Sequence, residues 1–320
     1  MKRDHGGDLD AARARFGGGD WIDLSTGINR NPWPVPLLTA QSWTALPGAE
    51  AESRLIREAA SWFGCPPDQV LPMAGATAGI QALPRLDRPG RAAVLWPSYN
   101  EHGASLAAAG WQVTRADDPE QMAGADLAVV VNPNNPDGRE WPPEMLARLA
   151  ADVGRLVVDE SFADPRPDLS LARAIPDNAV ILRSFGKFWG LAGLRLGFAL
   201  ARPDTLTALR EIAGPWAVSG PALEIGAQAM ADRAFADETI VYHSEAGLWL
   251  DIQAARAGWD CLGGTHLFRL YATPDARAAQ DRLARARIWS RRFPWSDRWL
   301  RLGIPGTREE RDRVADALRG

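Results

Sequence analysis

Four short apolar segments constrain the fold of this chain most strongly. They cover residues 92–96, 126–131, 155–158 and 179–183 and consist mainly of Ala, Val, Leu and Ile. Near-continuous apolar runs of this length predict strands that are buried on both faces of a parallel sheet. Stretches with helical spacing, such as residues 143–151, lie between them and supply the crossovers that parallel strands need. The predicted fold class is therefore α/β, with a mostly parallel central sheet sandwiched by helices.

Polar residues stand at or just after the C-terminal end of each segment. They are Tyr99, His102, Asn135, Asp159, Ser184 and Lys187. Open α/β sheets bind their ligands at this edge. A further strand, residues 69–73, leads through Gly75 into a helix that opens with Ala76 and Thr77. Free N–H groups at such a helix start attract an anion, so a binding site for an anionic ligand is predicted here.

Lys187 stands out because lysine is almost absent from this chain. Of 36 basic residues only Lys2 and Lys187 are lysines. An amine can lose its proton and attack a carbonyl, whereas a guanidinium stays protonated in proteins. We therefore expect Lys187 to form a Schiff base with a carbonyl compound. The alternative interpretation is an ordinary surface lysine in a loop.

The length of 320 residues exceeds what a single small core supports, so more than one domain is expected. Residues 1–40, with Pro32, Pro34 and Pro36, are predicted to form an extended arm that contributes to a small domain. Residues 41–213 are predicted to form a large domain, and residues 214–320 a smaller α+β domain with a long helical region near residues 222–257. Asn29 lies in the arm beside Gly27, and either lines a substrate entrance or belongs to a segment that only wraps the surface.

Charge and composition exclude several classes of function. A net charge of -4 and a pI near 5.7 argue against general nucleic-acid binding. The four histidines and two cysteines show none of the spacings of metal ligands, so no metal is expected. The sequence has neither an apolar run of membrane-spanning length nor a leader peptide, which predicts a cytoplasmic protein that binds no membrane.

Three motifs appear in order: Asn135-Pro136-x-Gly138, Asp159-Glu160, and Ser184-x-x-Lys187 followed eight residues later by Arg195. With them, nearly the whole chain resembles the fold-type-I enzymes that use pyridoxal 5′-phosphate (PLP), in particular the histidinol-phosphate aminotransferase branch. Within that branch, residues 24–29 and 184–190 most resemble the threonine-phosphate decarboxylases of cobalamin biosynthesis. The resemblance implies PLP as cofactor, residues 41–213 as the PLP-binding domain, and a homodimer.

The resemblance also implies roles around the PLP ring. Lys187 would hold the cofactor as a Schiff base and move protons, and Asp159 would keep the pyridine nitrogen protonated. Asn135 would donate to the phenolic oxygen, and Tyr99 would stack on the ring. His102 would lie behind Asp159 and adjust its charge, or is an ordinary buried histidine.

The phosphate of PLP would be bound by Ser184, Arg195 and the N–H groups of Ala76 and Thr77. The substrate would be a small phosphorylated amino acid. Arg301 matches the family's arginine for the α-carboxylate, and Arg291 matches a position that contacts the substrate phosphate. Either arginine could instead be a plain surface residue.

Three positions depart from the family pattern. Phe162 stands where aminotransferases carry a tyrosine that donates to the phenolic oxygen, which weakens a transaminase interpretation. Gly186 replaces a frequent serine and leaves one phosphate donor fewer. Leu46 stands where a tyrosine often reaches the neighbouring subunit's cofactor.

The favoured activity is the decarboxylation of L-threonine O-3-phosphate to (R)-1-aminopropan-2-ol O-2-phosphate. The alternatives are a histidinol-phosphate-type aminotransferase and, more remotely, a non-catalytic PLP-binding protein.

Overall fold

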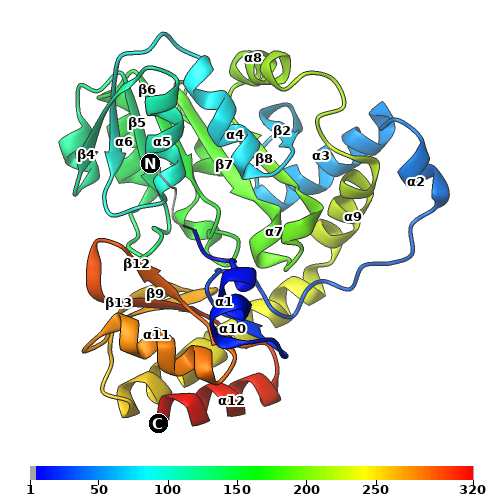
Figure 1. Ribbon diagram of the computed structural model, residues 1–320. Helices are drawn as coiled ribbons and strands as arrows, with labels where there is room; N and C mark the ends of the chain where they lie inside the picture. Colours follow the sequence, from blue (N-terminus) through cyan, green and yellow to red (C-terminus); the bar gives the residue numbers. More distant parts are fainter. Residues whose placement is uncertain (1–4, 320) are drawn as a thin grey trace. The chain divides into compact units, whose positions relative to one another are not determined.

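The computed structural model describes residues 5–319; residues 1–4, which include Lys2, and residue 320 lie outside the described part. The described chain forms two compact units (Figure 1), called here the large unit and the small unit. The large unit consists of residues 33–135 and 140–234, and the small unit of the described residues up to 32, 136–139 and those from 235 onward.

A seven-stranded sheet in the order β2-β8-β7-β6-β5-β3-β4 forms the centre of the large unit. Its strands are β2 (Val70–Met73), β3 (Arg91–Leu95), β4 (Gln112–Ala116), β5 (Leu127–Val131), β6 (Arg155–Asp159), β7 (Ala179–Ser184) and β8 (Gly197–Leu200). Only β8 runs antiparallel to its two neighbours, β2 and β7. The other pairs are parallel. The predicted mostly parallel sheet is thus confirmed.

Helices cover both faces of this sheet (Figure 1). The helices of the large unit are α2 (Ala40–Thr44), α3 (Ala49–Phe63), α4 (Ala76–Ala82), α5 (Asn100–Ala108), α6 (Pro143–Ala151), α7 (Phe185–Phe188), α8 (Pro203–Ala213) and α9 (Gly220–Ala231), of which α2 packs against α9 rather than on the sheet. Helix α3 shows why they form. It buries Leu55, Ala59 and Phe63, which recur every four residues and so share one face. It ends at Gly64, whose left-handed conformation (φ 74°) favours glycine.

A four-stranded antiparallel sheet in the order β12-β13-β10-β9 forms the small unit together with its helices. The strands are β9 (Asp260–Thr265), β10 (Phe268–Ala272), β12 (Arg291–Phe293) and β13 (Ser296–Gly303), and a separate parallel pair joins β1 (Ile22–Asp23) to β11 (Ile288–Trp289). The helices are α1 (Leu9–Phe16), α10 (Arg233–Arg256), α11 (Ala276–Arg285) and α12 (Arg308–Arg319). Six short 3-10 turns complete the described elements: Pro67–Gln69, Leu83–Arg85, Pro119–Met122, Pro167–Leu169, Leu171–Ala174 and Ala192–Leu194.

Two parts of the chain differ from expectation. The long helical region predicted near residues 222–257 is broken at Asp232 into α9 and α10. The amino-terminal arm contains helix α1, capped by the Asp8 side chain, in addition to the predicted extended segment. The domain boundaries at residues 40 and 213 stay a prediction. None of the helices in residues 5–319 combines the length and the hydropathy that crossing a bilayer requires.

Candidate active site

A buried histidine–carboxylate pair lies where β6 ends. Nε2 of His102, on α5, is 2.8 Å from Oδ2 of Asp159, and both residues are 2% exposed. The backbone N–H of Ser161 donates to the other carboxylate oxygen. Burial alone would raise the pKa of Asp159, but the hydrogen bond with His102 and the charges of His102 and Lys187 lower that pKa well below its usual range. Asp159 is therefore ionised, and the imidazole donates through Nε2.

Lys187 follows β7 on the short helix α7. Its ammonium nitrogen lies 4.0 Å from the centre of the Phe162 ring, a cation–π contact. Its neighbours Phe188 and Trp189 are almost fully buried, so the backbone that carries the lysine is tightly packed. A Cβ at Gly186 would lie 2.7 Å from Cα of Ala192. Any side chain at this position, the serine that the resemblance led us to expect included, would collide with that backbone.

At the turn before α4 and the end of β7, backbone N–H groups and the Arg195 guanidinium lie close together. Ser184 pairs with Gly197 across β7 and β8, and a Cβ at Gly197 would lie 2.4 Å from the N–H nitrogen of Ala76. The Arg195 guanidinium approaches Gly75 so closely that a Cβ there would lie 2.9 Å from it. Arg195 itself has a left-handed φ of 56°, which is uncommon for arginine and frequent at functional sites. The predicted phosphate-binding residues are therefore brought together.

Tyr99 and Asn135 follow β3 and β5, which are neighbours in the sheet. The Tyr99 ring meets the His102 ring edge to face, with 6.1 Å between the ring centres. Asn134 joins the two loops, because its amide donates to the carbonyl of Pro97 and accepts from the Ser98 hydroxyl. The loops that carry the predicted ring-binding residues are thus fixed to each other.

A second buried charge cluster stands behind this site and was missed in the sequence. Arg183, 3% exposed, donates to Glu160 and to Asp164, at 2.9 Å each. Complete burial raises the pKa of Glu160 although Arg183 opposes that shift. Successive strand residues point to opposite faces, so Asp159 faces His102 while Glu160 faces Arg183 and links the ends of β6 and β7. A charged residue inside an apolar strand, as at Arg183, was the available signal.

In the small unit two arginines stand side by side. Arg291 on β12 is the cross-strand partner of Arg301 on β13. Arg301 is only 6% exposed, donates to the carbonyl of Ser25 at 2.9 Å and lies over the Phe268 ring. Like charges directly opposite each other are unfavourable unless an anion balances them. The pair therefore suits an anionic ligand.

The structure thus groups the predicted residues in two sets. In the large unit the set is Ala76, Thr77, Tyr99, His102, Asn135, Asp159, Ser184, Lys187 and Arg195, and in the small unit it is Asn29, Arg291 and Arg301. Among the residues described, no three His, Cys, Asp or Glu side chains are grouped as a metal site would need.

Comparison with known proteins identifies the family. The model of aminotransferase class I and II matches residues 20–318. A threonine-phosphate decarboxylase from Sinorhizobium sp. is 41% identical over 98% of this chain and 97% of the relative. Another from Pseudomonas aeruginosa is 41% identical over 99% of this chain and 97% of the relative.

Among solved structures, histidinol-phosphate aminotransferase from Sinorhizobium meliloti, in complex with pyridoxal-5′-phosphate, has a TM-score of 0.84 at 22% identity. The match covers 97% of this chain and 93% of that one, and at this identity it shows the fold alone. This chain therefore belongs to the aminotransferase class I and II family, and its predicted fold-type-I architecture is confirmed.

Proposed function

We propose that this protein is a PLP-dependent decarboxylase that converts L-threonine O-3-phosphate to (R)-1-aminopropan-2-ol O-2-phosphate and CO₂ in cobalamin biosynthesis. The observation that carries the proposal is 41% identity to two threonine-phosphate decarboxylases along almost the full length of each. Because related folds host different reactions, the proposal also needs a site that fits the chemistry.

The residues of the large unit fit PLP. An ionised, buried carboxylate at Asp159 suits a pyridine nitrogen that must stay protonated. The crowded turn of Gly75, Ala76 and Arg195 suits a phosphate, since backbone and guanidinium can both donate there. Lys187 supplies the amine for a Schiff base. When bound, PLP supplies an electron sink for the pair left on Cα as a bond to it breaks.

The chain's own groups then have distinct tasks. With PLP bound, Asp159 would hold a proton on the ring nitrogen, and the N–H of His102 would keep that carboxylate ionised and oriented. Lys187 is proposed to deliver a proton to the carbon that CO₂ leaves. Phe162 lacks the hydroxyl that aminotransferases of this fold use, and it presents only its ring to the lysine amine. This difference favours decarboxylation over transamination.

The substrate's two anionic groups suit the two arginines of the small unit. We assign the α-carboxylate to Arg301 and the phosphate to Arg291, with Asn29 as a further donor. The juxtaposition of two cations across β12 and β13 supports this assignment.

The test is a spectrum of the purified, PLP-loaded protein followed by addition of threonine phosphate. We expect the absorbance of the lysine-bound cofactor, release of one CO₂ per substrate, and loss of both in Lys187→Ala. Histidinol phosphate is the matched second substrate. Conversion of the cofactor to its pyridoxamine form by that compound, without CO₂ release from threonine phosphate, would replace this proposal by an aminotransferase.

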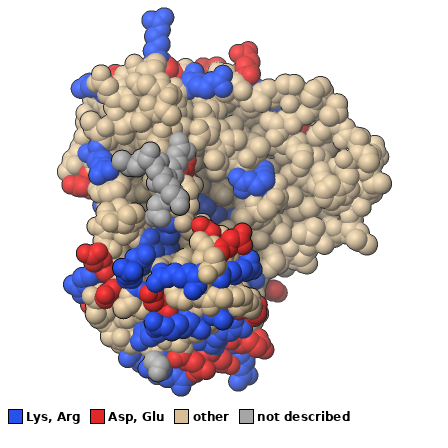
Figure 2. Space-filling view, viewed as in Figure 1, with Lys and Arg blue, Asp and Glu red and all other residues tan. Residues whose placement is uncertain are grey.

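We also propose that the enzyme is a homodimer that associates through the surface around α2. Between Arg30 and Glu50 the sequence has no charged residue. Trp43, Leu46 and Trp216 are 69%, 67% and 59% exposed. Figure 2 shows few charged side chains over this part of the large unit, on the right of the view. Exposed apolar areas of this kind mark protein interfaces.

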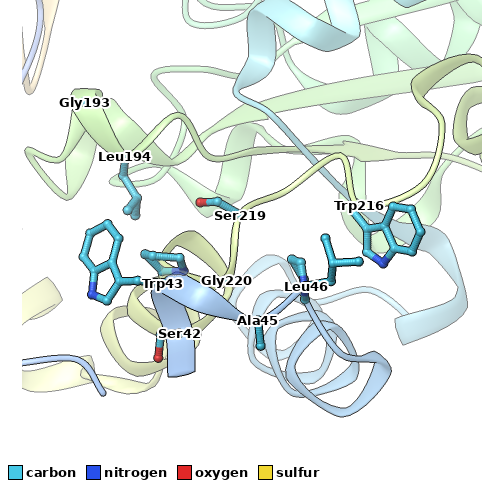
Figure 3. A pocket seen from close by; sticks show the side chains of 11 residues that line it. Ser42, Trp43, Ala45, Leu46, Gly193, Leu194, Trp216, Ser219 and Gly220 are labelled. Atoms are coloured by element: carbon cyan, nitrogen blue, oxygen red, sulfur yellow. The ribbon is translucent and has the colours of Figure 1, made fainter. Parts of the chain in front are cut away.

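A hollow of about 410 Å³ opens in this surface and could receive a side chain of the second copy. Trp43 and Leu194 lie on one side of it and Trp216 on the other (Figure 3). Sedimentation is expected to give a dimer for the wild type and a shift toward monomer for Trp43→Glu. A wild-type monomer at micromolar concentration would contradict this proposal.

A further inference from the structure

A second buried histidine, outside the residues discussed so far, contacts the predicted substrate residue Asn29. His243 lies on α10 and is 2% exposed, as is Asn29. Nε2 of His243 is 2.9 Å from Oδ1 of Asn29. The backbone N–H of Asn31 donates to the same oxygen, also at 2.9 Å. The His243 contact joins residues that are 214 positions apart in the chain.

The Asn31 contact settles which atoms face each other. A backbone N–H can only donate, so the atom of Asn29 that it meets must be the carbonyl oxygen. That oxygen can only accept, and therefore Nε2 of His243 carries a hydrogen and donates it. The carboxamide is held from two directions at its acceptor end, which also determines where its NH₂ group points.

The surrounding chain keeps this arrangement rigid. The side chain of Asn31 donates to the carbonyl of Gly306 at 2.8 Å. Arg30 forms an ion pair with Glu310 on α12. Arg30 and Asn31 are thus tied to α12 and the loop before it, and His243 holds the Asn29 side chain from α10.

We propose that His243 is a positioning residue, which orients the Asn29 carboxamide so that its NH₂ group, rather than its oxygen, is presented to the anionic substrate. This inference rests on the proposed function only in that Asn29 contacts substrate. The reason for a positioning device is electrostatic. A carboxamide that is free to rotate by half a turn would present its oxygen to an anion half of the time, and an oxygen repels the anion that an N–H attracts.

The experiment is a double-mutant cycle with Asn29→Ala and His243→Leu, measured as KM and kcat on the compound that the wild type turns over, threonine phosphate or histidinol phosphate. We expect His243→Leu to raise KM about five- to tenfold with little change in kcat, which is the size of one lost hydrogen bond. In the Asn29→Ala background the same change is expected to leave KM unaltered, because the carboxamide that His243 orients is gone.

His243→Gln is the rescue variant, since its amide nitrogen can donate from nearly the same place as Nε2. Its KM is expected to return to within about twofold of the wild type. Melting curves separate a folding defect from a positioning defect. If His243→Leu does not fold, His243→Asn replaces it, since that side chain stays polar but is too short to reach Oδ1.

Two results would overturn the inference: an equal rise of KM in both backgrounds, or an unchanged KM in a folded His243→Leu protein. Failure of the proposed function is a different result, namely a wild type that releases no CO₂ from threonine phosphate but reacts with histidinol phosphate. In that case the cycle is measured on histidinol phosphate and still decides the role of His243. A wild type that acts on neither compound overturns both proposals.

Discussion

The molecule contains two histidine pairs that are alike in geometry and differ in charge. In the large unit Nε2 of His102 faces a carboxylate oxygen of Asp159 at 2.8 Å. In the small unit Nε2 of His243 faces a carboxamide oxygen of Asn29 at 2.9 Å. All four residues are 2% exposed. Burial and distance are therefore the same, and the chemical character of the partner is the variable.

The consequences for charge are opposite. Asp159 stays ionised because its histidine and Lys187 lower its pKa despite burial. His243 is paired with an uncharged carboxamide. Burial, the charge of His266 and then that of Arg311 lower the pKa of His243 to about 4. At neutral pH His243 is an uncharged donor. A histidine paired with a carboxylate keeps that carboxylate charged. A histidine paired with a carboxamide stays neutral and can only orient the carboxamide.

The largest effect is expected from Asp159→Asn, which gives the first pair the partner type of the second. Under the proposed function the PLP ring nitrogen would lose the carboxylate that keeps it protonated, and kcat is expected to fall about a thousandfold, or roughly 4 kcal/mol. Steady-state CO₂ release measures it. Asp168→Asn, at an exposed aspartate paired with Arg166, is the matched control and should leave kcat unchanged. A fall in kcat of less than about tenfold in Asp159→Asn would show that the charge of this carboxylate is not needed for the reaction.

The next effect is the pH dependence of stability caused by His243. Its pKa in the folded state, about 4, lies below the ordinary value of 6.5, so the unfolded chain binds the proton first as pH falls. The loss of folding stability due to His243 is absent above about pH 6.5 and grows to about 3 kcal/mol as pH falls to about 4. Urea unfolding of the wild type and of His243→Gln between pH 7 and 4 measures it. Parallel curves for the two proteins would show that His243 titrates normally.

Asn29→Asp is the converse substitution, because it gives His243 a carboxylate partner like that of His102. The new charge should raise the pKa of His243, so the loss of stability between about pH 6.5 and 4 should shrink. A carboxylate near an anionic substrate should also raise KM, by about tenfold or more. The same unfolding series and a substrate titration measure both. An unchanged KM would remove Asn29 from the substrate site.

The smallest effect is expected from His102→Leu. Asp159 keeps the N–H of Ser161 and the nearby charge of Lys187, so kcat should fall only about five- to tenfold. The acidic limb of the pH–rate profile should move to higher pH, since the pKa of Asp159 rises when a partner that lowers it is lost. If His102 were purely structural, His102→Leu would lower the melting temperature and leave the acidic limb of the pH–rate profile unchanged.

Much of the large unit could be predicted because its signals are local. Runs of Val, Leu and Ala buried on both faces need no partner to be recognised as strands, and β5, β6 and β7 begin and end within one residue of the predicted segments. The single lysine among the described residues was visible from composition alone. The helix boundary at Asp232 was missed because both flanking segments have helical composition, and only packing decides between one helix and two.

The sequence by itself determined the parallel strands of the large unit, the family, and the candidate residues for binding a phosphorylated aldehyde, since each depends on neighbouring residues or short spacings. Only the tertiary structure decided that the residues 159 and 160 have separate tasks, that Gly186 has no room for a side chain, and that Arg291 stands opposite Arg301. It alone brought His243 to Asn29. Charge, burial and hydrogen bonding depend on neighbours in space, and these come from positions far apart in the chain.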